Sequence, residues 1–336
     1  MKRVIHEIAA AAVLSLFLLP AGAALACTWA VYSGGTSSVV ARTMDWYSDD
    51  GAVVEGHGRN VAVKAADTPN ALEYKSKYAS IQIRGGVSGL VSEAMNEKGL
   101  QCSLLFLDGS QLPVPSPQHR DVGIANFVSY IVSNFATVNE ALAALPSINV
   151  YPAAFHSIQG SNGPRLDYET QNTPLHFAVA DTGGDRAVIE FIDGAVKVYH
   201  GSQYDAMTNE PHYDVHLYLD SAGYQPNGTN LPVDRRARAR MYLADMRGRK
   251  VDGSPRTLLA MRGLLATVNA GTEQVDPVEN EVYPTMWSVL ADQENRAYYL
   301  SRYNTWNTEY YDFSMFPFEQ AKVVKLKTTA KPPVIK

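Results

Sequence analysis

Ala24-Leu25-Ala26-Cys27-Thr28-Trp29 marks a junction between two parts of the chain with different character. Residues 1–26 have the features of a secretory signal: the charged start Lys2-Arg3, an apolar centre over residues 9–19 and the small-residue cleavage motif at Ala24 and Ala26. Cleavage after Ala26 would make Cys27 the first residue. An amino-terminal cysteine carries a thiol nucleophile and a free α-amine, which can act as its general base. The junction therefore predicts that cleavage creates the nucleophile of an enzyme located in the periplasm or outside the cell.

Two other roles are open to this cysteine. A lipoprotein signal has Leu, or a close relative, three residues before the lipidated cysteine; here Ala24 takes that place, although Leu25 is adjacent. A lipid-anchored, non-catalytic binding protein is therefore the alternative from another class. The only other cysteine is Cys102, so one disulfide at most could form. The enzyme hypothesis requires Cys27 to be a free thiol.

Composition excludes several classes of function. The 336 residues carry a formal net charge of −5, which gives no reason to expect a nucleic acid or an anionic membrane as a partner. After residue 26 no apolar run approaches the roughly 20 residues of a membrane span. Asp49 and Asp50 have no second ligand cluster to complete a metal site, so neither a metal nor a cofactor is expected. Residues 27–336 are predicted to form a single domain that acts on a small molecule.

The pattern of apolar residues predicts an α+β fold. Residues 28–33 and 37–46 alternate around the turn Gly34-Gly35 and predict a β-hairpin that opens at Cys27. The other predicted strands are residues 78–84, 89–95, 100–107, 176–181, 187–191, 196–199, 283–290 and 296–302. Apolar residues at three- and four-residue spacing predict helices over residues 123–135, 138–145, 233–246 and 254–268, with Thr137 as the N-cap of the second. Two antiparallel sheets between two helical layers would bury every apolar face.

The second strand of the first hairpin ends in Arg42-Thr43-Met44-Asp45-Trp46. Alternation puts Arg42 and Met44 on one face of the strand, and Thr43 and Asp45 on the other. An arginine beside Cys27 would favour the thiolate, and Asp45 could hold the α-amine by a hydrogen bond. A surface ion pair on an edge strand is the alternative explanation.

Five short motifs connect the chain to a known family. They are Cys27-Thr28, Ala41-Arg42-Thr43-Met44-Asp45-Trp46, Met95-Asn96-Glu97-Lys98-Gly99-Leu100, Met207-Thr208-Asn209-Glu210-Pro211 and Asp234-Arg235-Arg236. Together, and in this order, they resemble the choloylglycine hydrolase family, which includes the bile salt hydrolases and the penicillin V acylases. That family belongs to the N-terminal nucleophile hydrolases. The resemblance therefore implies a four-layer αββα sandwich and an amide-cleaving first residue.

The resemblance also implies the roles of five catalytic residues. They are Cys27 as the nucleophile, Arg42 and Asp45 as the charged pair beside it, Asn209 as part of the oxyanion hole, and Arg235 as an arginine of the catalytic pocket.

The arginine assignment depends on register. Arg236 stands where relatives have an aromatic residue, and Arg238 and Arg240 follow it, so a shift of one turn is open. The alternative role for these arginines is a solvated basic helix face.

Trp46 and Phe106 are the candidate substrate-binding residues. In many relatives an Asn or Tyr contributes to the site at the position of Phe106, so the aromatic side chain here indicates a more apolar pocket. This combination resembles the exported Gram-negative branch of the family, described as penicillin V acylases that also act on N-acyl homoserine lactones. A bile salt hydrolase is the alternative with the same chemistry. The resemblance also suggests a homotetramer.

Overall fold

The computed structural model describes residues 27–46, 49–86, 88–152, 174–275, 280 and 282–328. The predicted signal peptide, residues 1–26, lies outside the described residues. Among the helices that are described, none combines the length and the apolar character needed to cross a membrane.

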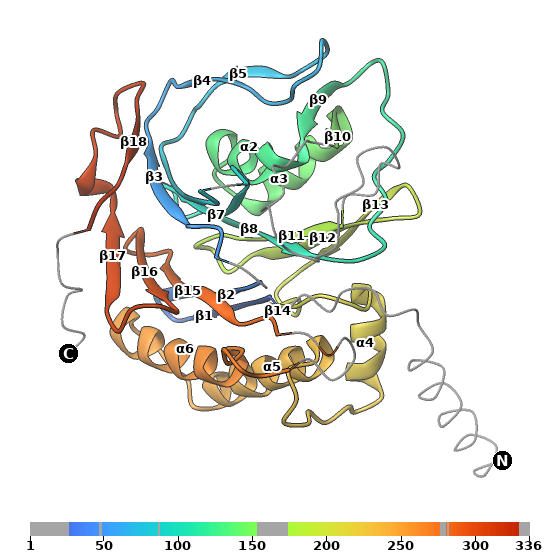
Figure 1. Cartoon of the computed structure of the whole chain (residues 1–336), viewed down its shortest axis with the longest axis vertical. Helices are drawn as coiled ribbons and strands as arrows, with labels where there is room; N and C mark the ends of the chain where they lie inside the picture. The colour runs from blue at the N-terminus through green and yellow to red at the C-terminus, as the bar shows by residue number, and fades with distance from the viewer. Residues whose placement is uncertain are drawn as a thin grey trace.

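Two antiparallel sheets face each other in the middle of the molecule (Figure 1). In spatial order the first contains β14 (Ala206–Met207), β1 (Thr28–Gly34), β2 (Ser37–Asp45), β15 (Thr285–Asp292), β16 (Ala297–Arg302) and β17 (Thr308–Asp312). The second contains β13 (Ala195–His200), β12 (Arg186–Ile192), β11 (Leu175–Ala180), β8 (Gln101–Phe106), β7 (Val91–Asn96), β6 (Ser80–Arg84), β3 (Val53–His57) and β18 (Val323–Lys325). The first hairpin, β1 with β2, thus lies inside its sheet with both edges paired.

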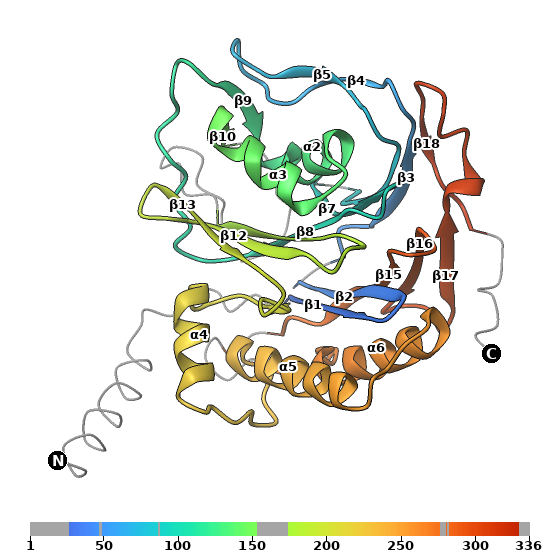
Figure 2. The ribbon, with the colours of Figure 1, turned by 180° about the vertical axis from the view of Figure 1, so that it is seen from behind.

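Helices cover the outer face of each sheet (Figure 2). On the eight-stranded sheet they are α2 (Phe127–Asn134) and α3 (Val138–Ala144), and on the six-stranded sheet α5 (Pro232–Gly248) and α6 (Ser254–Val268). A shorter helix, α4 (Tyr213–Ser221), follows β14. Two small ribbons complete the chain: β4 (Ala62–Lys64) with β5 (Glu73–Lys75), and β9 (Arg120–Gly123) with β10 (Ile148–Tyr151). The predicted four-layer αββα architecture is confirmed.

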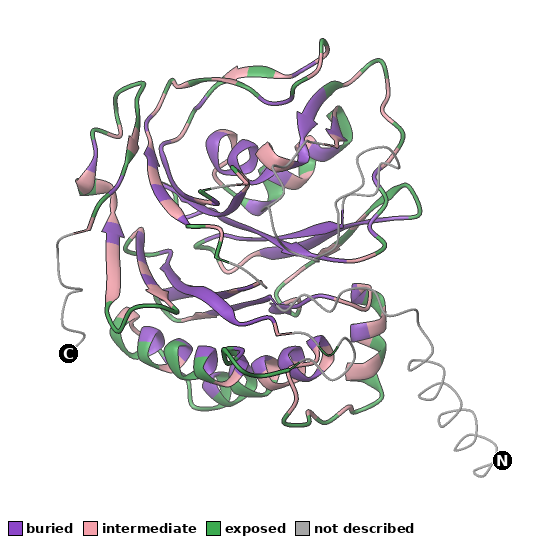
Figure 3. Ribbon diagram, in the orientation of Figure 1, coloured by how far each residue is buried: buried purple, intermediate pink, exposed green. Residues whose placement is uncertain are grey.

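Each contact between layers has its own apolar core, and Figure 3 shows the buried residues along the facing surfaces. One core, with Phe127 and Phe177, joins α2 and α3 to the eight-stranded sheet. Another, with Leu243 and Met261, joins α5 and α6 to the six-stranded sheet. The central core lies between the sheets and includes Cys27. Because both faces of both sheets are covered, polar side chains of the strands are buried as well, and they must find partners there.

The structure differs from the sequence-based elements in several places. The helix expected over residues 123–135 is present as the 3-10 turn Ile124–Asn126 followed by α2; only Gly123 differs, because Arg120–Gly123 pairs in parallel with Ile148–Tyr151. Helix α4 and the strands β3, β4, β5, β9, β10, β14, β17 and β18 were not predicted, and most of these strands are too short to show a period. Thr137 is the N-cap of α3, as expected: its hydroxyl accepts from the Glu140 N–H at 3.2 Å.

Candidate active site

Cys27 lies directly before β1, in the core between the sheets, with 1% of its surface exposed. Its Sγ is 4.0 Å from Met44 Sδ and 3.9 Å from the carbonyl oxygen of Asp45. Cys27 and Cys102 are both free, so the disulfide is excluded. Burial raises the pKa of the Cys27 thiol, and the nearby Arg42 guanidinium opposes this rise. Burial is the larger effect, so the pKa of the thiol stays above its ordinary value and the positive charge of Arg42 offsets the rise only in part.

Arg235 is the cation that contacts the backbone of Cys27. Its Nη1 donates to the Cys27 carbonyl oxygen and, at 2.8 Å, to Thr28 Oγ1. Its Nη2 donates to Asn209 Oδ1 at 2.9 Å. The same Oδ1 accepts from the Cys27 nitrogen at 2.7 Å. Arg235 and Asn209 therefore hold the backbone of Cys27 from both sides of the residue.

The neighbouring arginines of α5 bind elsewhere. Arg236 forms an ion pair with Asp220, with Nη2 at 2.9 Å from Oδ2. Arg238 donates to backbone carbonyl groups, one of them Thr267 O at 2.9 Å. Arg240 pairs with Asp220 and with Asp205, so it does not belong to a solvated basic face. The geometry thus selects Arg235 from the possible registers.

Two buried histidines hold the segment that carries Asn209. His176 Nε2 is 2.8 Å from the carbonyl oxygen of Thr208, and His216 Nε2 is 3.1 Å from that of Asn209. Burial lowers the pKa of His216 to about 3, so its ring is neutral and Nε2 is the donor. Glu190 faces the other nitrogen of His176 at 3.1 Å. Sequence reasoning missed these residues, because a lone buried histidine gives no signal of what it contacts.

Asp45 is buried at the end of β2. The hydrogen bond expected between its carboxylate and the α-amine of Cys27 concerns a cleaved chain, whereas in the uncut chain the Cys27 nitrogen is a peptide nitrogen with one hydrogen to donate. The Asp45 carboxylate accepts from Thr285 Oγ1 at 2.6 Å and from Thr43 Oγ1 at 3.2 Å. Burial raises the pKa of Asp45 to about 7, against the opposing effects of Arg235 and the two hydroxyl groups. The acceptor for the Cys27 nitrogen is Asn209 Oδ1, since its register places it opposite the start of β1.

Arg42 is fully buried between the sheets. Its Nη2 donates to Leu104 O at 2.7 Å, and its guanidinium carbon is 4.5 Å from the centre of the Trp287 ring. Arg42 and Met44 therefore share the inner face of β2, as alternation predicted, and the surface ion pair is excluded.

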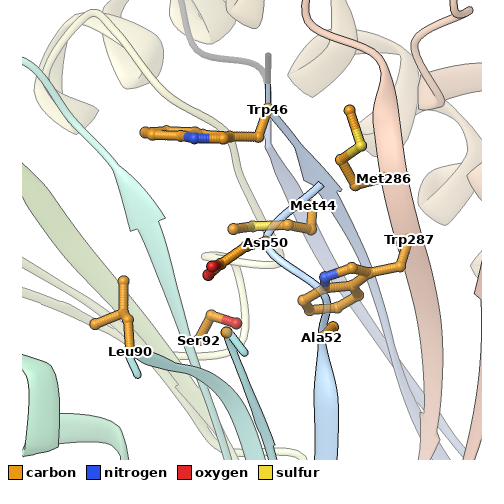
Figure 4. A pocket seen from close by; sticks show the side chains of 9 residues that line it. Met44, Trp46, Asp50, Ala52, Leu90, Ser92, Met286 and Trp287 are labelled. Atoms are coloured by element: carbon orange, nitrogen blue, oxygen red, sulfur yellow. The ribbon is translucent and has the colours of Figure 1, made fainter. Parts of the chain in front are cut away.

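A small, partly open pocket lies beside these residues, as Figure 4 shows. Its walls are mainly apolar, with Asp50 and Ser92 as polar members, and are formed by Met44, Trp46, Asp50, Ala52, Gly85, Leu90, Ser92, Met286 and Trp287. Met44 contacts both this pocket and the Cys27 sulfur. A larger, charged surface depression lies at Arg59, Glu97 and Phe318, with none of the site residues in its lining.

The two candidate substrate-binding residues differ in position. Trp46 lines the pocket. Phe106 is absent from the described lining; its ring lies edge-on to Trp46, with centroids 6.2 Å apart. Its carbonyl oxygen accepts from Asn209 Nδ2 at 2.8 Å. Phe106 thus touches Trp46 and Asn209 rather than the cavity. Within the described ranges, no three His, Cys, Asp or Glu side chains gather in a way that could hold a metal ion.

Comparison with known proteins agrees with this geometry. Residues 27–225 match the family described as linear amide C–N hydrolases, choloylglycine hydrolase family. The chain belongs to this family.

Relatives of known structure and sequence extend the match. A penicillin V acylase from Pectobacterium atrosepticum is 32% identical over 255 residues, which is 71% of this chain and 65% of that protein. The structure of a penicillin V acylase from Agrobacterium tumefaciens superposes with a TM-score of 0.75 at 27% identity, covering 88% of this chain and 90% of the other. A mutant of the conjugated bile acid hydrolase from Clostridium perfringens shares the fold, with a TM-score of 0.74 at 19% identity over 90% of this chain and 97% of the other.

Proposed function

We propose that the protein is an exported linear-amide hydrolase of the penicillin V acylase type, with Cys27 as its amino-terminal nucleophile. One observation carries the proposal: three parts of Cys27 have three different partners. Its nitrogen donates to Asn209, its carbonyl oxygen accepts from Arg235, and its sulfur lies beside Met44, which lines the pocket. In the uncut chain this nitrogen is a peptide nitrogen and cannot act as a base. Removal of residues 1–26 is therefore the activating step.

The reaction begins when the α-amine of Cys27 takes the proton of its own thiol. Sγ attacks the carbonyl carbon of the substrate amide, and the carbonyl oxygen becomes an oxyanion. As the tetrahedral intermediate collapses, the α-ammonium gives its proton to the leaving amine, and a thioester remains on Cys27. Water then attacks the thioester with the α-amine as base, which releases the carboxylic acid and restores the thiol.

Asn209 and Arg235 have complementary roles in this scheme. Asn209 Oδ1 orients the α-amine, and its Nδ2 has one hydrogen directed at Phe106 O, which leaves the second for the oxyanion. A single donor of this kind typically contributes about 3 kcal/mol to the transition state. Arg235 fixes both Cys27 and Asn209, since one guanidinium bridges the two residues.

The pocket favours an uncharged, apolar acyl group. Trp46, Met286 and Trp287 offer aromatic and thioether surface, and a phenyl or alkyl group would bury against them. Phenoxyacetyl amides and N-acyl homoserine lactones have such acyl groups. The alternative substrate, a glycine-conjugated bile acid, presents a larger and rigid ring system.

The first test concerns Cys27 itself. Intact mass and amino-terminal sequencing of the exported protein should show a chain that begins with an unmodified Cys27, and Cys27→Ser should lose at least 100-fold in amidase activity. A diacylglyceryl adduct on Cys27 would instead support the lipid-anchored binding protein. Amidase activity of the serine variant equal to wild type would contradict the mechanism.

The second test ranks the substrates. Phenoxyacetyl amides, long-chain acyl homoserine lactones and glycocholate are compared by kcat/KM with the same preparation. We expect the first two to exceed glycocholate, and a clear preference for glycocholate would reject the penicillin V acylase type in favour of a bile salt hydrolase.

A further inference from the structure

A buried carboxylate that the proposed mechanism does not use lies behind Arg42. Glu93, in β7, is fully buried between the sheets. Its oxygens accept from Tyr298 Oη at 2.7 Å, from Gln101 Nε2 at 2.8 and 3.0 Å, and from Ser103 Oγ. Tyr298 comes from the opposite sheet, on β16, so Glu93 is held from both layers.

These contacts indicate the charge of Glu93. Every partner directs a donor toward the carboxylate, and Gln101 is turned this way because its Oε1 accepts from Trp29 Nε1 at 3.1 Å. The amide Nε2 of Gln101 can only donate, and it reaches both oxygens of the carboxylate, while the hydroxyl groups of Ser103 and Tyr298 can donate to it as well. Burial raises the pKa of Glu93, whereas Arg42 and the three donors lower it. The hydrogen-bond pattern therefore fits the ionised form.

Arg42 is the cation closest to this carboxylate. Its Nε is 4.0 Å from Glu93 Oε2, which is an ion pair but not a hydrogen bond. Within the described part of the chain, Nε and Nη1 of Arg42 have no hydrogen-bond partner, although both are buried. The guanidinium is fixed by Leu104 O and the Trp287 ring instead. Glu93 thus acts on Arg42 through charge rather than through a shared hydrogen.

We propose that Glu93 is the counter-ion of Arg42, a positioning residue that limits how strongly the guanidinium stabilises the Cys27 thiolate. A buried arginine without a counter-ion would carry an uncompensated charge, which is destabilising. With Glu93 present, the negative charge of its carboxylate partly cancels the electrostatic field of Arg42 at Cys27, so the thiolate is stabilised less than it would be by Arg42 alone. This inference rests on the proposed role of Cys27 as a thiol nucleophile.

The other charges around the thiol are accounted for. Asp45 on β2 opposes the thiolate, and Arg235 on α5 favours it. The α-amine of the mature chain is part of Cys27. Around Glu93, the other titratable groups within the described ranges are Tyr298 on β16 and Cys102 on β8. Replacing Glu93 by Gln removes a negative charge, so the thiolate should form at lower pH.

The test measures the rate at which iodoacetamide alkylates Cys27 as a function of pH, with the exported protein and peptide mass spectrometry to separate Cys27 from Cys102. In wild type the alkylation rate rises over the pH range in which the Cys27 thiol ionises, and we call this rise the limb of the profile. In Glu93→Gln we expect the limb to lie roughly half to one pH unit lower, so that at a pH below the limb alkylation is about threefold to tenfold faster. The acid limb of kcat/KM should move in the same direction.

Tyr298→Phe is the matched control, because it removes one donor to Glu93 and keeps the charge. Its thermal stability should fall as in Glu93→Gln, with the alkylation limb close to that of wild type. A Glu93→Gln limb that stays in place or moves to higher pH would overturn the proposal and make Glu93 a structural residue. Alkylation requires no substrate, so this result can be interpreted even if the amidase assay fails.

Discussion

Arg235 donates from the first turns of α5 to the carbonyl oxygen of Cys27, a residue 208 positions earlier in the chain. The same side chain reaches Asn209 Oδ1, so helix, β1 and the segment after β14 meet at one guanidinium. Arg235 is fully buried, and its planar fork is the one basic group that can serve three acceptors in fixed directions. The alignment of Cys27, the proposed nucleophile, therefore depends on it.

Arg235→Lys should lower kcat/KM for a phenoxyacetyl amide about 100-fold or more, because one ammonium group cannot reach Cys27 O, Thr28 Oγ1 and Asn209 Oδ1 together. Steady-state kinetics and a thermal melt measure the effect. Arg238→Lys, in the same helix as Arg235, is the control: it loses bonds to the backbone carbonyls of Thr267 and Thr229 and should affect stability more than kcat/KM. Equal kinetic losses in both variants would contradict the role given to Arg235.

Asn209→Asp should reduce kcat about 100-fold to 1000-fold with a smaller change in KM, because it keeps the Oδ1 acceptor and removes the Nδ2 donor. Asn149→Asp offers a comparison at another buried asparagine, in β10. If the Asn209 variant retains wild-type kcat, a backbone N–H rather than Asn209 would stabilise the oxyanion.

Trp46→Ala should raise KM for a phenoxyacetyl amide about tenfold, since the indole forms one wall of the pocket. Phe106→Leu should have a weaker effect of the same sign, because Phe106 acts through its edge contact with Trp46. The control is Trp306→Ala, whose side chain is fully exposed. An unchanged KM in Trp46→Ala would place the acyl group outside this pocket.

The Glu55 carboxylate should make a pH-dependent contribution to the free energy of unfolding, and this contribution is independent of the active site. Its carboxylate lies 2.6 Å from Arg84 Nη2 and 3.1 Å from His57 Nε2, and these partners lower its pKa to about 2. A lowered carboxyl pKa stabilises the fold above the unfolded value of about 4.3, and this contribution is lost as the pH falls toward 2. Glu55→Gln should therefore lower the free energy of unfolding at pH 7 by about 1–2 kcal/mol.

Urea unfolding at pH 7 and pH 3 checks this prediction. The difference between wild type and Glu55→Gln should shrink at pH 3, whereas Glu73→Gln, at an exposed position of β5, should have little effect at either pH. A difference that stays constant between the two pH values would show that the ionisation of Glu55 is not responsible.

Local sequence patterns identified much of the architecture. Alternation located the hairpin of β1 and β2, and helical spacing located α3, α5 and α6, because burial of one face leaves a periodic trace in the sequence. Short strands such as β14 have no such trace; they exist because a partner strand satisfies their backbone groups. Strand β18 is likewise too short to show a period, and it is paired with β3, which lies far from it in the sequence.

The sequence by itself singled out Cys27, Arg42 and Arg235 as candidate catalytic residues, since they stand in motifs whose order and residue types can be recognised along the chain. Only the tertiary structure decided what these residues touch. The peptide nitrogen of Cys27 donates to Asn209, and Arg42 lies beside Glu93, which no motif had singled out. The physical reason is that periodicity reports which face of a strand is buried, whereas the partner on that face depends on sheet register and on the stacking of layers distant in sequence.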